Sequence, residues 1–172
     1  VVDDPTRMPG ATWFEGARLN FAENMLRYRD DNIALSFKGE QQDVESYTTQ
    51  ELYDAVSKVA KTFRQIGLEQ GDCVAGVVAN SPETIITMLA TLSIGAIWSS
   101  CSPDFGIEGI LSRFSQIKPK IIVTVDAYYY KGQSVDVAQK VETIVTQLPS
   151  VKDIVVISYA GKGIGSFRDV DR

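Results

Sequence analysis

Residues 71–104, GDCVAGVVANSPETIITMLATLSIGAIWSSCSPD, decide the fold that the sequence predicts. The segment 73–79 is an almost unbroken apolar run, which is typical of a strand covered on both faces. Ser81 can accept a hydrogen bond from a free amide and Pro82 suits the first helical position, so a helix is expected to begin here. Residues 96–101 are expected to form a second buried strand. The stretch therefore predicts a βαβ unit with a right-handed crossover.

The rest of residues 48–172 continues this alternation of helices and apolar strands. The expected elements are helices at 48–66, 104–117 and 135–148, with strands at 121–125 and 154–159. Thr48 and Glu51 are expected to cap the first of these helices and Asp104 the second. The order predicts an α/β fold, with a doubly wound, mostly parallel sheet and helices on both faces, in a Rossmann-like subdomain over 48–172.

Residues 1–47 are expected to form an arm, a short helix and a β-hairpin. Asn20 followed by Glu23 indicates a helix over 21–28, and the segment 33–47 contains two strands around a turn. Four large apolar side chains are expected to fix the arm to the core: Trp13, Phe14, Leu19 and Phe21.

Composition excludes several classes of function. The 172 residues carry a net charge of −5, which argues against general binding to nucleic acid or anionic membranes. The sequence has no histidine, so it contains no Ser-His-Asp triad and no imidazole metal site. Cys73 and Cys101, the two cysteines, are expected to be reduced residues of buried strands.

The chain shows no sign of a targeting or membrane segment. Its start, VVDDPTRMPG, has no initiator Met and no signal-peptide pattern, and no apolar run reaches the ~20 residues needed to span a bilayer. We expect a cytoplasmic piece of a longer protein.

Three motifs could carry chemistry at the strand ends. The tail 161–166, GKGIGS, is a weak phosphate-loop pattern because it matches neither established Gly-rich motif. The hydroxyls and thiol of 99–102 lack a base nearby in sequence and are better interpreted as small residues at a strand end. The run 128–131, Tyr-Tyr-Tyr-Lys, could hold a nucleotide ring and a phosphate, or could be an exposed loop.

A series of motifs runs in order along the chain: Tyr47-Thr48, Glu51-Leu52, Gly67, Gly71-Asp72-Cys73-Val74, Asn80-Ser81-Pro82-Glu83, Leu92, Gly95-Ala96 and Ser102-Pro103. This order resembles the N-terminal part of the adenylate-forming acyl-CoA synthetases. The segment from Trp13 to Asn24 resembles their short-chain branch, and that from Trp98 to Gly106 is most similar to its acetoacetate-activating members. The resemblance implies that the sheet is one part of the large N-terminal, AMP-binding domain of such an enzyme, here incomplete.

The family's chemistry follows from the resemblance. ATP and a carboxylate give an acyl-adenylate and pyrophosphate with Mg²⁺ present, and the thiol of CoA then displaces AMP. Acetoacetate, ATP and CoA are the implied small-molecule partners, in a cytoplasmic ligase of lipid metabolism and ketone-body utilisation. The family's phosphate loop, ribose-binding Asp, hinge and adenylation Lys have no counterpart here. The chain alone is therefore expected to be inactive, to bind no cofactor tightly and to be able to self-associate.

The resemblance also implies a CoA-facing edge. The turn Ser102, Pro103 and Asp104 corresponds to a segment near the CoA nucleotide, and Tyr130 and Gln133 stand where relatives carry arginines for its phosphate. Lys131 is the only cation of that stretch. No catalytic residue and no metal ligand is expected.

Three alternatives stay open at the level of the sequence. One is a non-catalytic, flavodoxin-like nucleotide-binding module, since doubly wound sheets host many functions. Another is a synthetase for acetate, propionate or butyrate. The third, a purely structural half of an enzyme, would fit the same apolar strands.

Overall fold

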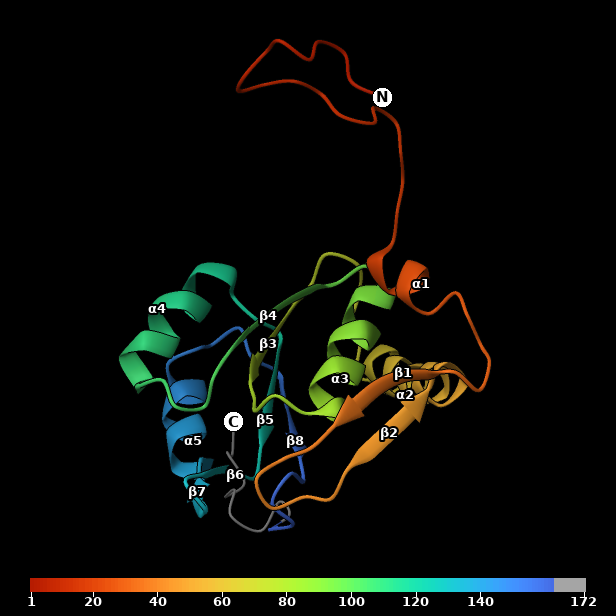
Figure 1. Ribbon diagram of the computed structural model, residues 1–172. Helices are drawn as coiled ribbons and strands as arrows, with labels where there is room; N and C mark the ends of the chain where they lie inside the picture. Colours follow the sequence, from red (N-terminus) through yellow and green to blue (C-terminus); the bar gives the residue numbers. More distant parts are fainter. Residues whose placement is uncertain (163–172) are drawn as a thin grey trace.

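The computed structural model describes residues 1–162 (Figure 1). Its elements, in chain order, are α1 (Phe21–Met25), β1 (Ile33–Phe37), β2 (Glu45–Thr48), α2 (Thr49–Gln65), β3 (Cys73–Val77), α3 (Pro82–Ser93), β4 (Ile97–Cys101), α4 (Ile107–Ile117), β5 (Ile121–Val125), β6 (Ala127–Tyr130), β7 (Gln133–Asp136), α5 (Ala138–Thr146) and β8 (Asp153–Ile157). The division into 1–47 and 48–172 stays a prediction, and residues 163–172 lie outside the described part.

The central sheet has the order β4-β3-β5-β8, and all its neighbouring strands are parallel. Helices α2 and α3 lie on one side of it, and α4 and α5 on the other (Figure 1). The chain moves outward from β3 to β4 and then returns past β3 to β5, so the winding direction reverses between β3 and β5. The predicted doubly wound α/β fold is confirmed.

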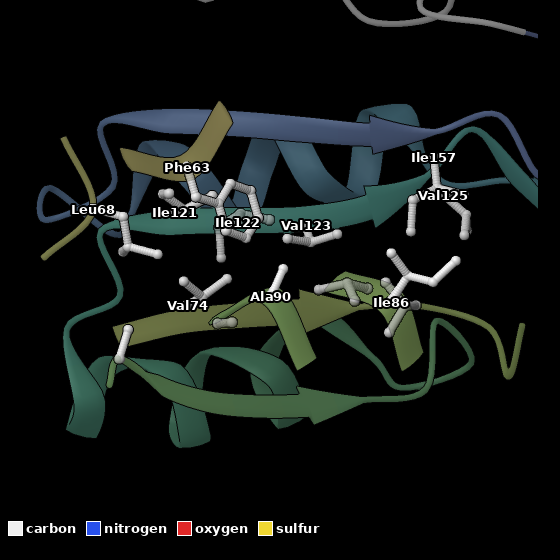
Figure 2. Packing of buried hydrophobic residues seen from close by; sticks show 14 of the residues in the cluster. Phe63, Leu68, Val74, Ile86, Ala90, Ile121, Ile122, Val123, Val125 and Ile157 are labelled. Atoms are coloured by element: carbon white, nitrogen blue, oxygen red, sulfur yellow. The ribbon is translucent and has the colours of Figure 1, made fainter. Parts of the chain in front are cut away.

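The core fills both faces of this sheet. All five residues of β5 are buried, as expected for a central parallel strand covered by helices on each side. Figure 2 shows Phe63 of α2 by Ile121 and Ile122 of β5, and Ile86 of α3 nearer to Val125 at the other end of that strand. The buried side chains of α2, on Leu52, Val56, Ala60 and Phe63, form the face that this helix turns toward the core.

Helices α2 and α3 begin at the capping residues that the sequence predicts. The amide of Glu51 donates to Thr48 Oγ1 at 3.1 Å and the amide of Thr48 donates to Glu51 Oε2 at 2.8 Å, which completes a capping box. Ser81 accepts from the amide of Thr84 and Pro82 is the first residue of α3. The β1–β2 hairpin also forms as predicted.

The prediction for the N-terminal arm is wrong. Trp13 and Phe14 are each 61% exposed, Leu19 is 94% exposed and Phe21 is 55% exposed. The arm leads away from the helices and sheet (Figure 1), and its contacts include a bridge between Val2 and Trp13 within the arm itself. Aromatic side chains thus do not fix it to the core, because α2 and α3 already cover that face of the sheet.

Three local predictions are also corrected. Asp104 does not cap α4: Gly106 is the N-cap residue and makes no side-chain cap bond. The expected loop at 128–132 is instead the antiparallel hairpin β6–β7, so α5 begins only at Ala138. Lys131 and Gly132 form its tip with φ of 51° and 76°, the positive angles that a two-residue hairpin turn requires.

Strand β4 is also less covered than its apolar sequence predicts. It lies at the edge of the sheet, with Ile97 50% exposed. Cys101 at its end and Cys73 on β3 are half-buried free thiols, which confirms the prediction of reduced cysteines but not of complete burial.

Candidate functional site

A cavity of about 500 Å³ lies where the strands β3, β4 and β8 end. Its lining residues come from five parts of the chain: Ser36, Phe37, Lys38, Gly39, Glu40, Ala79, Asn80, Ser102, Pro103, Asp104, Tyr128, Tyr129 and Tyr159. Ligands of open α/β sheets bind beyond the carboxyl ends of the strands, beside the point where the winding reverses. The cavity is at this place, and we refer to it as the strand-end cavity.

The turn after β4 forms one wall of the strand-end cavity and is held by α5. Lys140 Nζ donates to the carbonyl oxygens of Pro103 at 2.6 Å and Phe105 at 3.2 Å. Within the turn, the hydroxyl of Ser102 donates to Asp104 Oδ2 at 3.1 Å. Because one ammonium group binds two backbone oxygens, the shape of this turn depends on a side chain thirty-odd positions further along the chain.

Two hairpins form the opposite walls and are tied to each other. Glu40 Oε2, in the turn between β1 and β2, accepts the amide of Gly132 in the β6–β7 turn at 2.8 Å. Gln42 Nε2 donates to the carbonyl oxygen of Tyr159 at 3.2 Å. The ring of Tyr159 lies 6.5 Å from that of Phe37 and 6.2 Å from that of Tyr129, measured between centroids. The cavity therefore has an aromatic wall, which suits a planar or apolar part of a ligand.

The end of β5 is fixed by a fully buried carboxylate. Asp126 accepts the amides of Ala127 and Ala160 at 2.8 Å and of Lys162 at 2.7 Å, and the hydroxyl of Ser158 at 3.3 Å. These bonds hold the segment after β8, from which Tyr159 reaches the cavity. The charge of Asp126 is thus used to order backbone amides.

The polar groups of the cavity are donors and acceptors and not nucleophiles. Burial and then the neighbouring Asp104 carboxylate raise the pKa of Tyr128 to about 12, so its hydroxyl keeps its proton at neutral pH. Burial raises the pKa of the Cys101 thiol, although Arg113 and Lys140 oppose this effect. Since the thiolate is the reactive form, Cys101 is unsuited to nucleophilic catalysis. This part of the molecule can bind and orient a ligand.

The structure divides the predicted CoA edge into two parts. Ser102, Pro103 and Asp104 line the strand-end cavity, whereas Tyr130, Lys131 and Gln133 lie at the end of the β6–β7 hairpin and do not line it. Lys131 Nζ lies 5.3 Å from the centroid of the Tyr130 ring. The bond from Gly132 to Glu40 brings this hairpin end beside the cavity. Their roles toward CoA stay predictions.

Sequence reasoning missed the contribution of the N-terminal hairpin. Lys38 is the lysine of the cavity lining, and Phe37 supplies part of the aromatic wall. The turn 38–40 could be read from the sequence, but nothing in it indicated that this turn folds over the ends of strands much further along the chain.

No metal ligand set forms in the described part of the chain. Residues 1–162 contain no group of three or more His, Cys, Asp or Glu side chains that could hold an ion. Of the GKGIGS tail, only Gly161 and Lys162 are described, and residues 163–166 lie outside the described residues. Within the described residues, every helix is too short or too polar to cross a bilayer.

The fold and the strand-end cavity define an α/β protein with a cavity at a reversal of the sheet winding, the place where open α/β sheets bind ligands. The model of the family "AMP-binding enzyme" matches residues 21–166. The chain therefore belongs to the AMP-binding enzyme family, which confirms the resemblance read from the motifs.

Named relatives within this family are acetoacetyl-CoA synthetases. The chain is 47% identical to acetoacetyl-coenzyme A synthetase of Rhizobium meliloti (strain 1021) over 92% of its own length and 24% of the relative's. It is 47% identical to acetoacetyl-CoA synthetase of Gallus gallus over 86% of its length and 22% of the relative's. The solved structure of acetoacetyl-CoA synthetase from Streptomyces lividans matches with a TM-score of 0.85 and 38% identity, over 90% of this chain and 24% of that one. The chain thus spans about a quarter of the length of the proteins it matches.

Proposed function

We propose that the chain forms the first part of the AMP-binding domain of an acetoacetate–CoA ligase (AMP-forming). The observation that carries this proposal is the 47% identity to an acetoacetyl-CoA synthetase over 92% of the chain. The family match favours this function over a flavodoxin-like module without catalysis. The chemistry of acetoacetate, acetate, propionate or butyrate activation is the same, so the acid is the part of the proposal that needs direct measurement.

The proposed reaction proceeds in two balanced steps. A carboxylate oxygen attacks the α-phosphorus of ATP, an O–P bond forms, and pyrophosphate leaves with its electron pair. The sulfur of CoA then attacks the acyl carbon, a C–S bond forms, AMP leaves and the thiol proton passes to solvent. Mg²⁺ would neutralise phosphate charge in the first step. The adenylate is itself a good leaving group, which fits a chain without histidine and with a protonated Cys101.

We assign the strand-end cavity and the adjoining β6–β7 turn to the nucleotide end of CoA. The turn at Ser102 and Asp104 offers a hydroxyl and a carboxylate, Tyr128 offers a protonated phenol, and Lys131 supplies a cation at the hairpin end. The aromatic wall suits contact with the adenine ring. None of these side chains takes part in bond making, so the isolated chain is proposed to be inactive.

Activity measurements test the proposal. The natural protein that contains this chain is incubated with ATP, Mg²⁺, CoA and one of acetoacetate, acetate, propionate or butyrate, and thioester formation is followed. The expected result is the highest kcat/KM with acetoacetate and no thioester from the 172-residue chain alone. A preference for another acid would refute the substrate, and turnover by the chain alone would refute its inactivity.

A charge reversal tests the CoA edge separately. Lys131→Glu in the natural protein is expected to raise the KM for CoA about tenfold, because it replaces attraction to a phosphate by repulsion, while the KM for ATP stays the same. Lys61→Glu, on the exposed face of α2, is the matched control with the same change in charge. Equal KM values for CoA in both variants would remove Lys131 from the site.

Location and assembly are further parts of the proposal. We propose a cytoplasmic enzyme with small-molecule substrates, and we propose that the chain alone self-associates through its exposed arm, where Trp13, Phe14 and Leu19 present apolar surface. Light scattering of the chain and of a Trp13→Ser/Phe14→Ser variant tests this point. A monodisperse monomer at high protein concentration would contradict it.

A further inference from the structure

A second cavity, of about 530 Å³, lies between α1, α2 and the end of α3. It shares no lining residue with the strand-end cavity. Its lining residues are Asn20, Glu23, Leu26, Arg27, Arg29, Tyr53, Val56, Ser57, Ala60, Arg64 and Ser93. We refer to it as the arginine cavity, because three of these residues are arginines in a chain whose net charge is −5.

These three guanidinium groups have no carboxylate partner. The one ion pair within residues 1–162 joins Lys120 to Asp72, and neither residue lines this cavity. Glu23 is the one acidic residue of the lining, so the cavity carries an excess of two positive charges. Three cations around one cavity repel one another, and a bound anion would relieve that repulsion.

Two of the guanidinium groups are held in place by neighbours that do not neutralise them. Arg29 Cζ lies 3.7 Å from the centroid of the Tyr53 ring. Such stacking uses the face of the guanidinium and leaves its in-plane N–H groups free to donate. Arg27 Nη1 donates to Asn24 Oδ1 at 2.6 Å, which fixes one nitrogen and leaves the others available.

The walls of the arginine cavity are also fixed relative to each other. Asn20 Nδ2 donates to the carbonyl oxygen of Leu92 at 2.8 Å and thereby ties the start of α1 to α3. The floor consists of apolar side chains: Leu26 is 7% exposed, Val56 2% and Ala60 4%. A rigid apolar floor under a rim of guanidinium groups is suited to a ligand with an anionic end and an organic body.

We propose that the arginine cavity binds a phosphate ester of a small organic molecule, with the phosphate on Arg27, Arg29 and Arg64 and the organic part on the floor. A guanidinium fork matches phosphate oxygens in a bidentate way. The phenol of Tyr53 and the hydroxyl of Ser57 can donate further hydrogen bonds to the ester, whereas the hydroxyl of Ser93 already donates to the carbonyl oxygen of Ala90 at 2.7 Å. This site does not depend on the proposed ligase activity, because it uses other residues and other elements.

Titration of the isotope-labelled 172-residue chain with ADP, and separately with inorganic pyrophosphate, tests the proposal by amide NMR shifts at low salt. ADP combines a phosphate end with an organic body, whereas pyrophosphate has the charge alone. The expected result is saturable binding of ADP, at least as tight as that of pyrophosphate, with the largest shifts at residues 26–29 and 53–64. Failure of ADP to bind, or shifts confined to 36–40 and 102–104, would overturn the proposal.

Two matched variants make the result specific. Arg64→Gln should weaken ADP binding about tenfold, since it removes one charge-assisted contact. Lys61→Gln makes the same change in charge on the exposed side of the same helix and should leave binding within about twofold. Both sites are exposed, so both variants are expected to keep the fold, which thermal unfolding checks. Equal weakening by both variants, or binding of an acidic peptide in place of ADP at these residues, would refute the site.

Discussion

The close packing of Trp98 on Gly76 gives a prediction that tests how β4 is placed. These residues lie on neighbouring parallel strands, and β4 leads directly into the turn of the strand-end cavity. A Cβ atom added at Gly76 would lie 2.9 Å from Trp98 Cζ2 and 3.0 Å from Cη2. Gly76→Ala therefore forces the indole ring, or the edge strand that carries it, to move.

The loss of unfolding free energy expected for Gly76→Ala follows from these distances. Overfilling a packed site by one methyl group typically costs about 1–3 kcal/mol of unfolding free energy. Without the contact, alanine in a strand would be about 0.5–1 kcal/mol more favourable than glycine, which has more backbone entropy to lose on folding. For a chain of this size, a loss of about 2 kcal/mol lowers Tm by roughly 4–8 °C.

A double-mutant cycle isolates this contact. Trp98→Phe removes the two closest of the three atoms that the new methyl group would meet, and Val78 Cγ2 remains at 3.1 Å. Gly76→Ala should therefore cost clearly less stability in that background than in the original chain. Urea unfolding is followed by circular dichroism, because the second substitution removes a fluorescent residue. An equal loss of stability in both backgrounds would refute the packing argument, and so would a Gly76→Ala variant as stable as the original chain.

Two further predictions concern the turn after β4 and the ion pair at the amino ends of β3 and β5. Lys140→Met should speed hydrogen exchange at the amide of Phe105, because the carbonyl oxygens of Pro103 and Phe105 lose the ammonium group that donates to both. An exchange rate equal to that of the original chain would contradict this role of Lys140. The hydrogen bond from Lys120 holds the pKa of Asp72 below its usual value of 3.8. That stabilisation is complete above pH 3.8 and is lost as the pH falls through the lower folded pKa. The Asp72→Asn variant should therefore lose less unfolding free energy than the original chain when the pH is lowered, which urea midpoints at successive pH values would show. If the midpoints of both proteins fell in parallel with pH, the ion pair would not contribute to stability.

The proposed ligase activity and the arginine cavity lead to separable experiments. The proposed activity is measured on the natural protein, whereas ligand binding at either cavity can be measured on the 172 residues. A chain that binds CoA at the strand-end turn and ADP at Arg64 would show two separate nucleotide sites. A substitution that abolishes binding at one cavity should leave binding at the other intact, because the two linings share no residue.

The sequence by itself determined the helices, the sheet and the family. Apolar runs without alternation identify central strands such as β5, and capping residues such as Thr48 and Ser81 begin helices, since both signals are local. The motif order from Trp13 to Gly106 was sufficient to indicate the AMP-binding enzymes. The turn at Lys131 and Gly132, where both φ angles are positive, is a local feature as well. The sequence alone nevertheless predicts a loop for the Tyr-rich run, because the strand that pairs with it lies beyond this turn.

Only the tertiary structure decided which segments meet. Glu40 contacts Gly132, Lys140 holds Pro103, and Asn20 reaches Leu92, and each pair is separated by many residues in sequence. No periodicity encodes such pairs, because they arise when elements pack around the sheet. Exposure is decided in the same way: the run from Ile97 to Cys101 is apolar enough for a buried strand, but its place at the sheet edge leaves it partly exposed.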